Sequence, residues 1–238
     1  MTPRQSFSSH PRIRDAAALG FTSSLGPFAA NGIMPGFHAM AEDFGVSFVA
    51  VQQSLTIYLF TYAFFSLVAG SFSDSYGRRP TFIGGMLLFA VASIGAAFSQ
   101  SLWALYGWRL LQGIGAAVGQ VVTQAIVRDN WSGPEAANVN GMIAFFFAAG
   151  PALAPVVGGQ IVMLFGWHAV FLFLLVYSLS IAAFIYYRIP ETLHASDRSP
   201  FNLSAVCGNY AKGLTHGAFM TGVIAHGILY TWHFLPFI

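Results

Sequence analysis

The stretch GSFSDSYGRRP, residues 70–80, places one aspartate and two arginines between two long apolar runs. The whole chain of 238 residues is 56% hydrophobic and only 8% charged, whereas about a quarter of the residues in an ordinary soluble domain are charged. This deficit indicates that lipid surrounds most of the chain. The charged stretch is therefore interpreted as a connection at the membrane surface between two membrane-spanning runs.

Apolar runs of the length that crosses a bilayer, about 20 residues each, recur along almost the whole sequence. They are predicted at about residues 16–34, 52–72, 80–98, 102–126, 136–164, 167–187 and 213–234. A backbone inside hydrocarbon must satisfy its own hydrogen bonds, and these runs lack the short alternation of barrel strands. The predicted fold class is therefore an all-α polytopic membrane protein.

The lysine and arginine residues outside the apolar runs all fall on one side of the membrane if each run crosses once. The residues on this side are Arg4, Arg12, Arg14, Arg78, Arg79, Arg128, Arg188, Arg198 and Lys212. By the positive-inside rule the amino terminus is predicted to be cytoplasmic. The first run is interpreted as a retained helix rather than a signal peptide, because no small-residue cleavage site precedes a soluble domain.

The charged stretch between the second and third runs has a spacing that suits a structured turn. Gly70 allows close helix approach, and Gly77 can adopt a left-handed conformation. Asp74 is expected to pair with Arg78 or to face the positive end of a neighbouring helix. Together with Arg79, these residues resemble the G-x-x-x-D-x-x-G-R-R loop of the major facilitator superfamily, which implies a cytoplasmic gate. For Arg79 alone, a purely topological role is an equal alternative.

The fourth run carries an arginine inside apolar sequence, RLLQGIGAAVGQVVTQAIVRD at residues 109–129. Arg109, Gln112 and Gly113 resemble the superfamily's helix-four motif R-x-x-Q-G, which implies a role in proton coupling. At 100° per residue they share a face with other polar or small residues, Ala116, Gln120, Thr123 and Gln124. A membrane arginine is costly and is a functional hypothesis by default. The alternative is that Arg109 snorkels to the nearby interface.

The fifth run contains a third motif, which resembles the glycine and proline pattern of the superfamily's antiporters. Its residues are Gly141, Gly150, Pro155, Gly158 and Gly159, with Ala154 in place of a usual glycine. Gly150, Ala154 and Gly158 recur every four residues, which predicts a ridge for close helix packing, and Pro155 is expected to bend the helix. Ordinary membrane packing is the structural alternative.

With IPETL at residues 189–193, the chain resembles the drug:proton antiporters of this superfamily, most closely the bacterial Bcr/CflA branch (bicyclomycin and chloramphenicol resistance). The resemblance implies two six-helix bundles, each made of two inverted three-helix repeats, in the bacterial cytoplasmic (inner) membrane, with substrate bound between the bundles. Residues 1–190 would form the first bundle, 191–212 a cytoplasmic central linker and 213–238 a seventh helix. The second bundle is expected in the same or another chain.

The sequence differs from this branch at the residue that is expected to carry protons. Its members usually carry an aspartate in helix one, where this chain has Asn31, and asparagine cannot take up and release a proton. The acidic residues are all expected outside the hydrocarbon core. His226 and His233 in the last run are candidate proton carriers, although hydrogen-bonded packing is the commoner role of such histidines.

Substrate contacts are expected from polar and aromatic side chains of the first, second and fourth runs: Asn31, Tyr58, Tyr62, Gln120 and Gln124. For the tyrosines, a hydroxyl bonded within the bundle is at least as good an interpretation. Trp167, like the other interfacial tryptophans, is interpreted as a belt residue. The sequence lacks a phosphate-binding loop and a zinc-spaced histidine pair, so no enzyme, cofactor or metal is predicted. The few basic residues disfavour nucleic acid.

Three functions follow from these observations. The leading hypothesis is that the chain is a fragment, the amino-terminal half of a transporter for proton-driven efflux of small drug-like or metabolite compounds, with protons and the lipid bilayer as further partners. Asn31 slightly favours an alternative, a facilitator or importer of a polar solute such as a nucleoside or sugar. The third hypothesis is a truncated membrane product that transports nothing or acts as an assembly partner.

Overall fold

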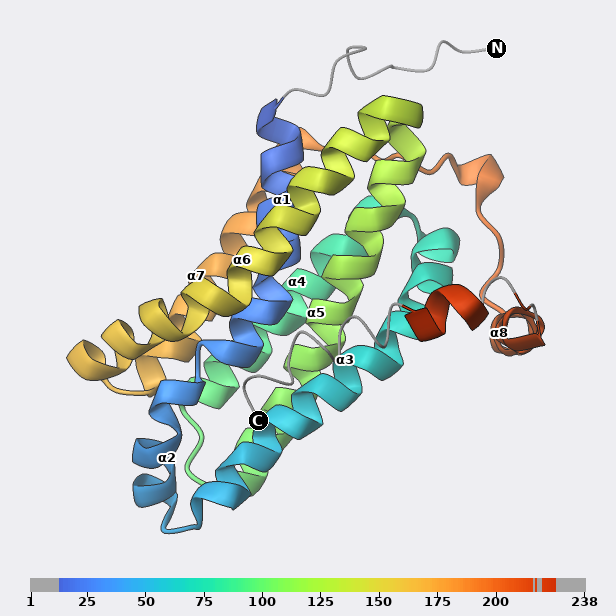
Figure 1. The fold of residues 1–238 in the computed structure, drawn as a ribbon. Coiled ribbons are helices and arrows are strands. Elements are labelled where there is room, and N and C mark those ends of the chain that lie inside the picture. The colour runs from blue at the N-terminus through green and yellow to red at the C-terminus, as the bar shows by residue number, and fades with distance from the viewer. Residues whose placement is uncertain (1–12, 216, 218–219, 226–238) are drawn as a thin grey trace. The chain divides into compact units, whose positions relative to one another are not determined.

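A computed structural model describes residues 13–215, 217 and 220–225 of the chain. The described elements are all helical (Figure 1): α1 (Ile13–Asn31), η1 (Met34–Gly36), α2 (Phe37–Phe44), α3 (Phe48–Tyr76), α4 (Arg78–Ala97), α5 (Leu102–Asn130), α6 (Gly133–Phe165), α7 (His168–Arg188), η2 (Ala195–Asp197) and α8 (Leu203–Thr215). The chain divides into two compact units, Met1–Ser199 and Pro200–Ile238. The predicted helical fold class is confirmed.

The long helices of the first unit, α1 and α3–α7, alternate in direction (Figure 1). The starts of α1, α4 and α6 therefore lie at the same end of this unit as the ends of α3, α5 and α7. This shared end carries Arg78, Arg79, Arg128 and Arg188. For these four residues, the grouping expected from the sequence is present in the structure.

The helix pairing of the first unit has an internal symmetry. α3 packs along α5, and α1 packs along α6. If α1 is matched with α5, α3 with α6 and α4 with α7, the pair α3–α5 corresponds to the pair α6–α1. The two helices of each match run in opposite directions (Figure 1). α4 packs against α7, a pair that the same matching leaves unchanged, and α4 also packs along α5. The arrangement is that of two inverted three-helix repeats.

Five helices of the described part are long and apolar enough to cross a membrane, namely α3 to α7. The run predicted as the first span corresponds to α1, which is not among these five. Thr22, Ser23 and Ser24 lower its hydropathy, and all three are buried. Their hydroxyls donate to backbone carbonyls of the same helix at 2.8–3.2 Å. Because protein rather than lipid surrounds most of α1, this helix needs less apolar surface than its neighbours.

The connection between α1 and α3 contains structure that the apolar runs do not predict. The chain turns through η1 and forms the short helix α2. Asp43 of α2 accepts a 2.6 Å hydrogen bond from the indole nitrogen of Trp167, which precedes α7. Trp167 is only 2% exposed, so its interpretation as a belt residue is wrong. A buried indole N–H needs an acceptor, and Asp43 supplies it.

The second unit begins within the segment predicted as the central linker. Helix α8 spans Leu203–Thr215, across the boundary expected between the linker and the seventh helix. Most of the seventh apolar run, including His226 and His233, lies outside the described residues.

Candidate functional site

The charged end of the first unit is built around the turn at Gly77. Gly77 has φ 99° and ψ 153°, and it both ends α3 and begins α4. Side chains other than glycine are strained in this region of backbone conformation. The turn lets the two long helices follow each other without a longer connection. Pro80 falls in the first turn of α4, where its missing N–H costs nothing.

Arg78 is the centre of a network that joins α3, α4 and α5. Its guanidinium forms an ion pair with Asp74, one turn earlier in the chain, and its Nε lies 3.0 Å from Asp129 Oδ2 at the end of α5. Its Nη1 also donates to Ser73 Oγ at 2.6 Å. Arg78 is only 8% exposed. A buried cation with these partners would be costly to leave unpaired, so the network holds the three helix ends in one arrangement.

Arg79 contacts α7 rather than the same network. It donates to the backbone carbonyl of Tyr186, and its guanidinium carbon lies 4.8 Å from the centre of the Tyr186 ring. The five residues that resemble the superfamily loop, Gly70, Asp74, Gly77, Arg78 and Arg79, are called the gate motif below. Asp74 and Arg78 pair as their spacing predicts, while a gating role stays a prediction.

Replacing Gly77 with alanine is expected to lower the free energy of unfolding by about 2 kcal/mol, because of backbone strain. The added Cβ would also lie 2.5 Å from Glu191 Oε2. The measurement is thermal unfolding of the purified protein in detergent. Gly84→Ala is the matched control, since Gly84 lies inside α4 and a Cβ added there would meet no other atom within 4 Å. That control should be neutral or slightly stabilising, and equal losses in both variants would contradict the role given to Gly77.

Arg109 lies inside the first unit, where α1, α3 and α5 meet. It is 0% exposed. Its Nη1 donates to Gln112 Oε1 at 2.9 Å and to the carbonyl of Ala29 at 3.2 Å. The guanidinium lies over the ring of Tyr58, with 4.2 Å between its central carbon and the ring centre. Gln112 in turn donates to Ser93 Oγ at 2.8 Å.

These contacts argue against the snorkelling interpretation of Arg109, while its role in proton coupling stays a prediction. A snorkelling side chain would extend to the surface, but the guanidinium is held by groups of α1, α3 and α5 instead. Its Nε and Nη2 atoms are buried and have no hydrogen-bond partner. Within the described residues no carboxylate pairs with it. A buried charge that is only partly satisfied is expensive, which marks this position as a candidate functional centre.

The neighbour of this cluster on the same helix, Gly113, permits close contact between α5 and α3. A Cβ at Gly113 would lie 2.7 Å from the carbonyl oxygen of Tyr58. The small residue therefore lets Tyr58 approach closely enough to stack on Arg109.

The glycine and proline motif of α6 provides the contact with α1. A Cβ at Gly158 would lie 1.9 Å from the carbonyl oxygen of Gly32, and one at Gly150 would lie 3.2 Å from Pro27 Cβ. Ala154 between them is fully buried. The predicted small-residue ridge is therefore present and packs on α1. Gly141 lies off this ridge in open space, and Gly159 makes only ordinary contact with Pro35 at 3.8 Å. Pro155 lies within α6, as expected, and so does Pro151.

The residues expected to contact substrate have different surroundings. Tyr58 is 1% exposed, and its hydroxyl donates to the carbonyl of Gly26 at 2.9 Å. This contact fits the alternative interpretation of Tyr58, a hydroxyl bonded within the bundle. Asn31 donates to Pro27 O at 2.8 Å. Gln120 has a buried Oε1 without a partner. The roles of these three residues, and of Tyr62 and Gln124, in substrate binding stay predictions.

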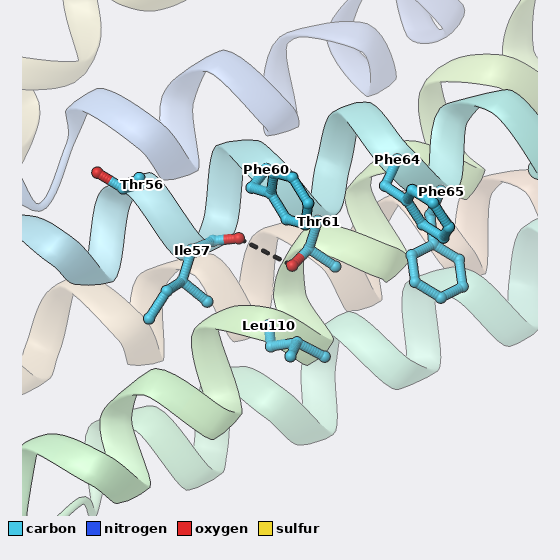
Figure 2. Close-up of a pocket in the computed structure, with 7 residues that line it drawn as sticks. All are labelled: Thr56, Ile57, Phe60, Thr61, Phe64, Phe65 and Leu110. Carbon is cyan, nitrogen blue, oxygen red and sulfur yellow. Dashed lines mark hydrogen bonds between the residues drawn. The ribbon is translucent and has the colours of Figure 1, made fainter.

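An apolar groove of about 420 Å³ lies on the surface of α3 and α5. Figure 2 shows the side chains that line it: Thr56, Ile57, Phe60, Thr61, Phe64, Phe65 and Leu110. The Thr61 hydroxyl donates to the carbonyl of Ile57 at 2.8 Å and is therefore occupied. A specific small-molecule site combines apolar walls with a few oriented polar groups. This groove offers little beyond apolar walls, so we do not assign it as the substrate site.

The sequence pattern of the Major Facilitator Superfamily matches residues 19–237. The chain therefore belongs to this superfamily of membrane transporters. The crystal structure of a peptide transporter, POT, in complex with alafosfalin shares the fold: its TM-score is 0.67 at 19% identity, covering 94% of this chain and 48% of that one.

Within the superfamily the chain resembles the Bcr/CflA branch. It is 33% identical over 192 residues to a bicyclomycin resistance protein homolog of Haemophilus influenzae, covering 81% of this chain and 48% of that protein. It is 36% identical over 160 residues to a chloramphenicol resistance protein of Pseudomonas aeruginosa, covering 67% and 38%. The chain spans about half the length, or less, of these relatives.

Proposed function

We propose that this chain supplies the amino-terminal half of a proton-driven exporter of small drug-like or metabolite compounds. The observation that carries the proposal is Arg109, a fully buried cation with two unpartnered nitrogens at the junction of three helices. Taking such a charge out of water is costly, even where some of its hydrogen bonds are made. Its cost is explained if the charge takes part in transport. The names of the relatives, which refer to drug resistance, support export of small molecules.

A second bundle is part of this proposal, in the same or another chain. The residues aligned with the Haemophilus influenzae relative cover only 48% of that protein. Transport in this fold rocks one bundle against the other around a site between them. The proposal therefore assigns the substrate site to the face that this unit shares with the second bundle. A truncated product that inserts and transports nothing is the alternative.

The proton carrier is proposed to lie outside the described spans. In the part of the chain that the structure describes, acidic residues occupy helix ends, the short helices or connections: Asp15, Glu42, Asp43, Asp74, Asp129, Glu135, Glu191 and Asp197. Asn31, at the end of α1, has a neutral amide side chain that cannot take up and release a proton as a carboxylate does. This arrangement favours either a carrier in the second bundle or the alternative function, a facilitator or importer of a polar solute.

Orientation follows from the shared arginine end of the first unit. We propose that this end, with the gate motif and the amino terminus, faces the cytoplasm of a bacterial cell and that the inner membrane holds the protein. Arginine in short connections is retained on the cytoplasmic side.

The test is accumulation of labelled chloramphenicol in an efflux-deficient bacterium that makes the protein from its native gene. A proton-driven exporter lowers the steady accumulation, and a protonophore removes this effect. A facilitator speeds equilibration, and a protonophore changes nothing. Accumulation equal to that of cells without the gene, at confirmed membrane levels of the protein and with several drugs, would support the non-transporting alternative and contradict the proposal.

A further inference from the structure

The segment after α7 is bound to the charged end of the first unit through Glu191. Glu191 Oε1 accepts hydrogen bonds from the backbone nitrogens of Arg78 at 2.9 Å and Leu193 at 3.1 Å. Its other oxygen, Oε2, accepts from the backbone nitrogen of Arg79 at 3.3 Å. One carboxylate thus binds the first two amides of α4 and folds its own connection back on itself.

The start of α4 needs such a partner from elsewhere. The first N–H groups of a helix have no acceptor within the helix, and they carry a partial positive charge. Ordinarily the side chain of the preceding residue caps them. Here the preceding residue is Gly77, which has no side chain and makes no cap hydrogen bond. Glu191 therefore replaces the local cap, and a Cβ at Gly77 would lie 2.5 Å from its Oε2.

The same segment reaches the ends of α3 and α5 as well. Thr192 Oγ1 donates at 3.0 Å to Asp129 Oδ2, the oxygen that also accepts from Arg78 Nε. The backbone nitrogen of Ser199 donates at 3.3 Å to the carbonyl of Asp74. Residues 191–199, called the strap below, therefore contact all three helices that the Arg78 network joins.

We propose that the strap positions the gate motif for transport and that Glu191 is its positioning residue. Glu191 acts through the start of α4, where it fixes the backbone of Arg78 and so the direction of its guanidinium. The negative charge matters because it faces two amides of a positive helix end. This inference rests on the proposed function for its transport consequence, but the contact itself is testable without transport.

The experiment compares Glu191→Gln with the unchanged protein by hydrogen–deuterium exchange and by transport. Peptides covering residues 73–82 and 189–199 should exchange up to about five-fold faster in the variant, because glutamine keeps one acceptor oxygen but replaces the other with an NH2 group that cannot accept, and complete loss of a cap has an effect of about this size. Peptides from the middle of α5, which contains Arg109, should be unchanged. The maximal rate of transport should fall several-fold with KM unchanged, because Glu191 contacts no expected substrate residue.

Asp197→Asn is the matched control, because Asp197 belongs to the same strap and its carboxylate accepts from its neighbour Ser196 within the strap. This variant should match the unchanged protein in both measurements. A second test combines Glu191→Gln with Gly77→Ala, which displaces the same carboxylate. In the double variant, the exchange at residues 73–82 should rise by less than the combined effect of the two single substitutions.

If exchange at residues 73–82 were unchanged in Glu191→Gln, the positioning role proposed for the strap would be overturned, whatever the transport result. Faster exchange throughout α3–α7 would also overturn it, since Glu191 would then stabilise the whole unit rather than position the gate motif. Absence of transport in the unchanged protein would instead count against the proposed function and would leave the exchange test of the strap intact.

Discussion

Replacing Arg109 with alanine is expected to abolish drug export while the protein still reaches the membrane. The change removes the donor to Gln112 and to the carbonyl of Ala29, together with the stacking on Tyr58. It also leaves a cavity, which together with the lost hydrogen bonds should cost about 3 kcal/mol of stability. The measurement is drug accumulation in efflux-deficient cells, normalised to the amount of protein in the membrane fraction.

Two further variants separate a loss of function from a loss of folding. Arg109→Lys keeps the charge and much of the volume but lacks the planar fork, so export should fall strongly with little loss of stability. Arg128→Ala is the matched control on the same helix, since Arg128 is an exposed arginine in its last turn. Normal, proton-coupled export by Arg109→Ala would show that the central assignment is wrong.

Replacing Gly158 with alanine should produce the largest loss of stability among the glycine variants of α6. The added Cβ would overlap the backbone of Gly32, where neither helix can yield without separating from the other. Overpacking of this kind costs about 3 kcal/mol or more. The measurement is the unfolding temperature in detergent, followed by intrinsic tryptophan fluorescence.

The adjacent residue supplies the control for this variant. Gly159→Ala places its Cβ in ordinary contact with Pro35 and should change stability by less than about 0.5 kcal/mol. If both variants unfolded at the same temperature as the unchanged protein, the close approach of α1 and α6 would not be required for stability.

Local spacing in the sequence predicts much of this arrangement. The pairing of Asp74 with Arg78 follows from their positions one turn apart, and the ridge of Gly150, Ala154 and Gly158 follows from a four-residue repeat. Both patterns lie on a single helix or at its end. The helical periodicity alone therefore determines which side chains share a face.

Contacts between distant segments are beyond this kind of reasoning. Glu191 lies in a polar connection, and nothing in its local pattern shows that its carboxylate caps α4. Asp43 and Trp167 likewise meet only because α2 folds against the start of α7. For Tyr58, the pattern gives the face but does not tell whether the hydroxyl is free for substrate or bound to Gly26. Such choices depend on which carbonyl lies nearest in the assembled unit.

The setting of α1 has a consequence for biosynthesis. Among the long helices of the first unit α1 is made before the others, yet the helix along which it packs, α6, is made after α3, α4 and α5. The segment Thr22–Ser24 carries hydroxyl groups, which gain less from lipid than apolar side chains do. The order of synthesis therefore leaves α1 without its main packing partner until α6 has been made, just as α4 must wait for α7.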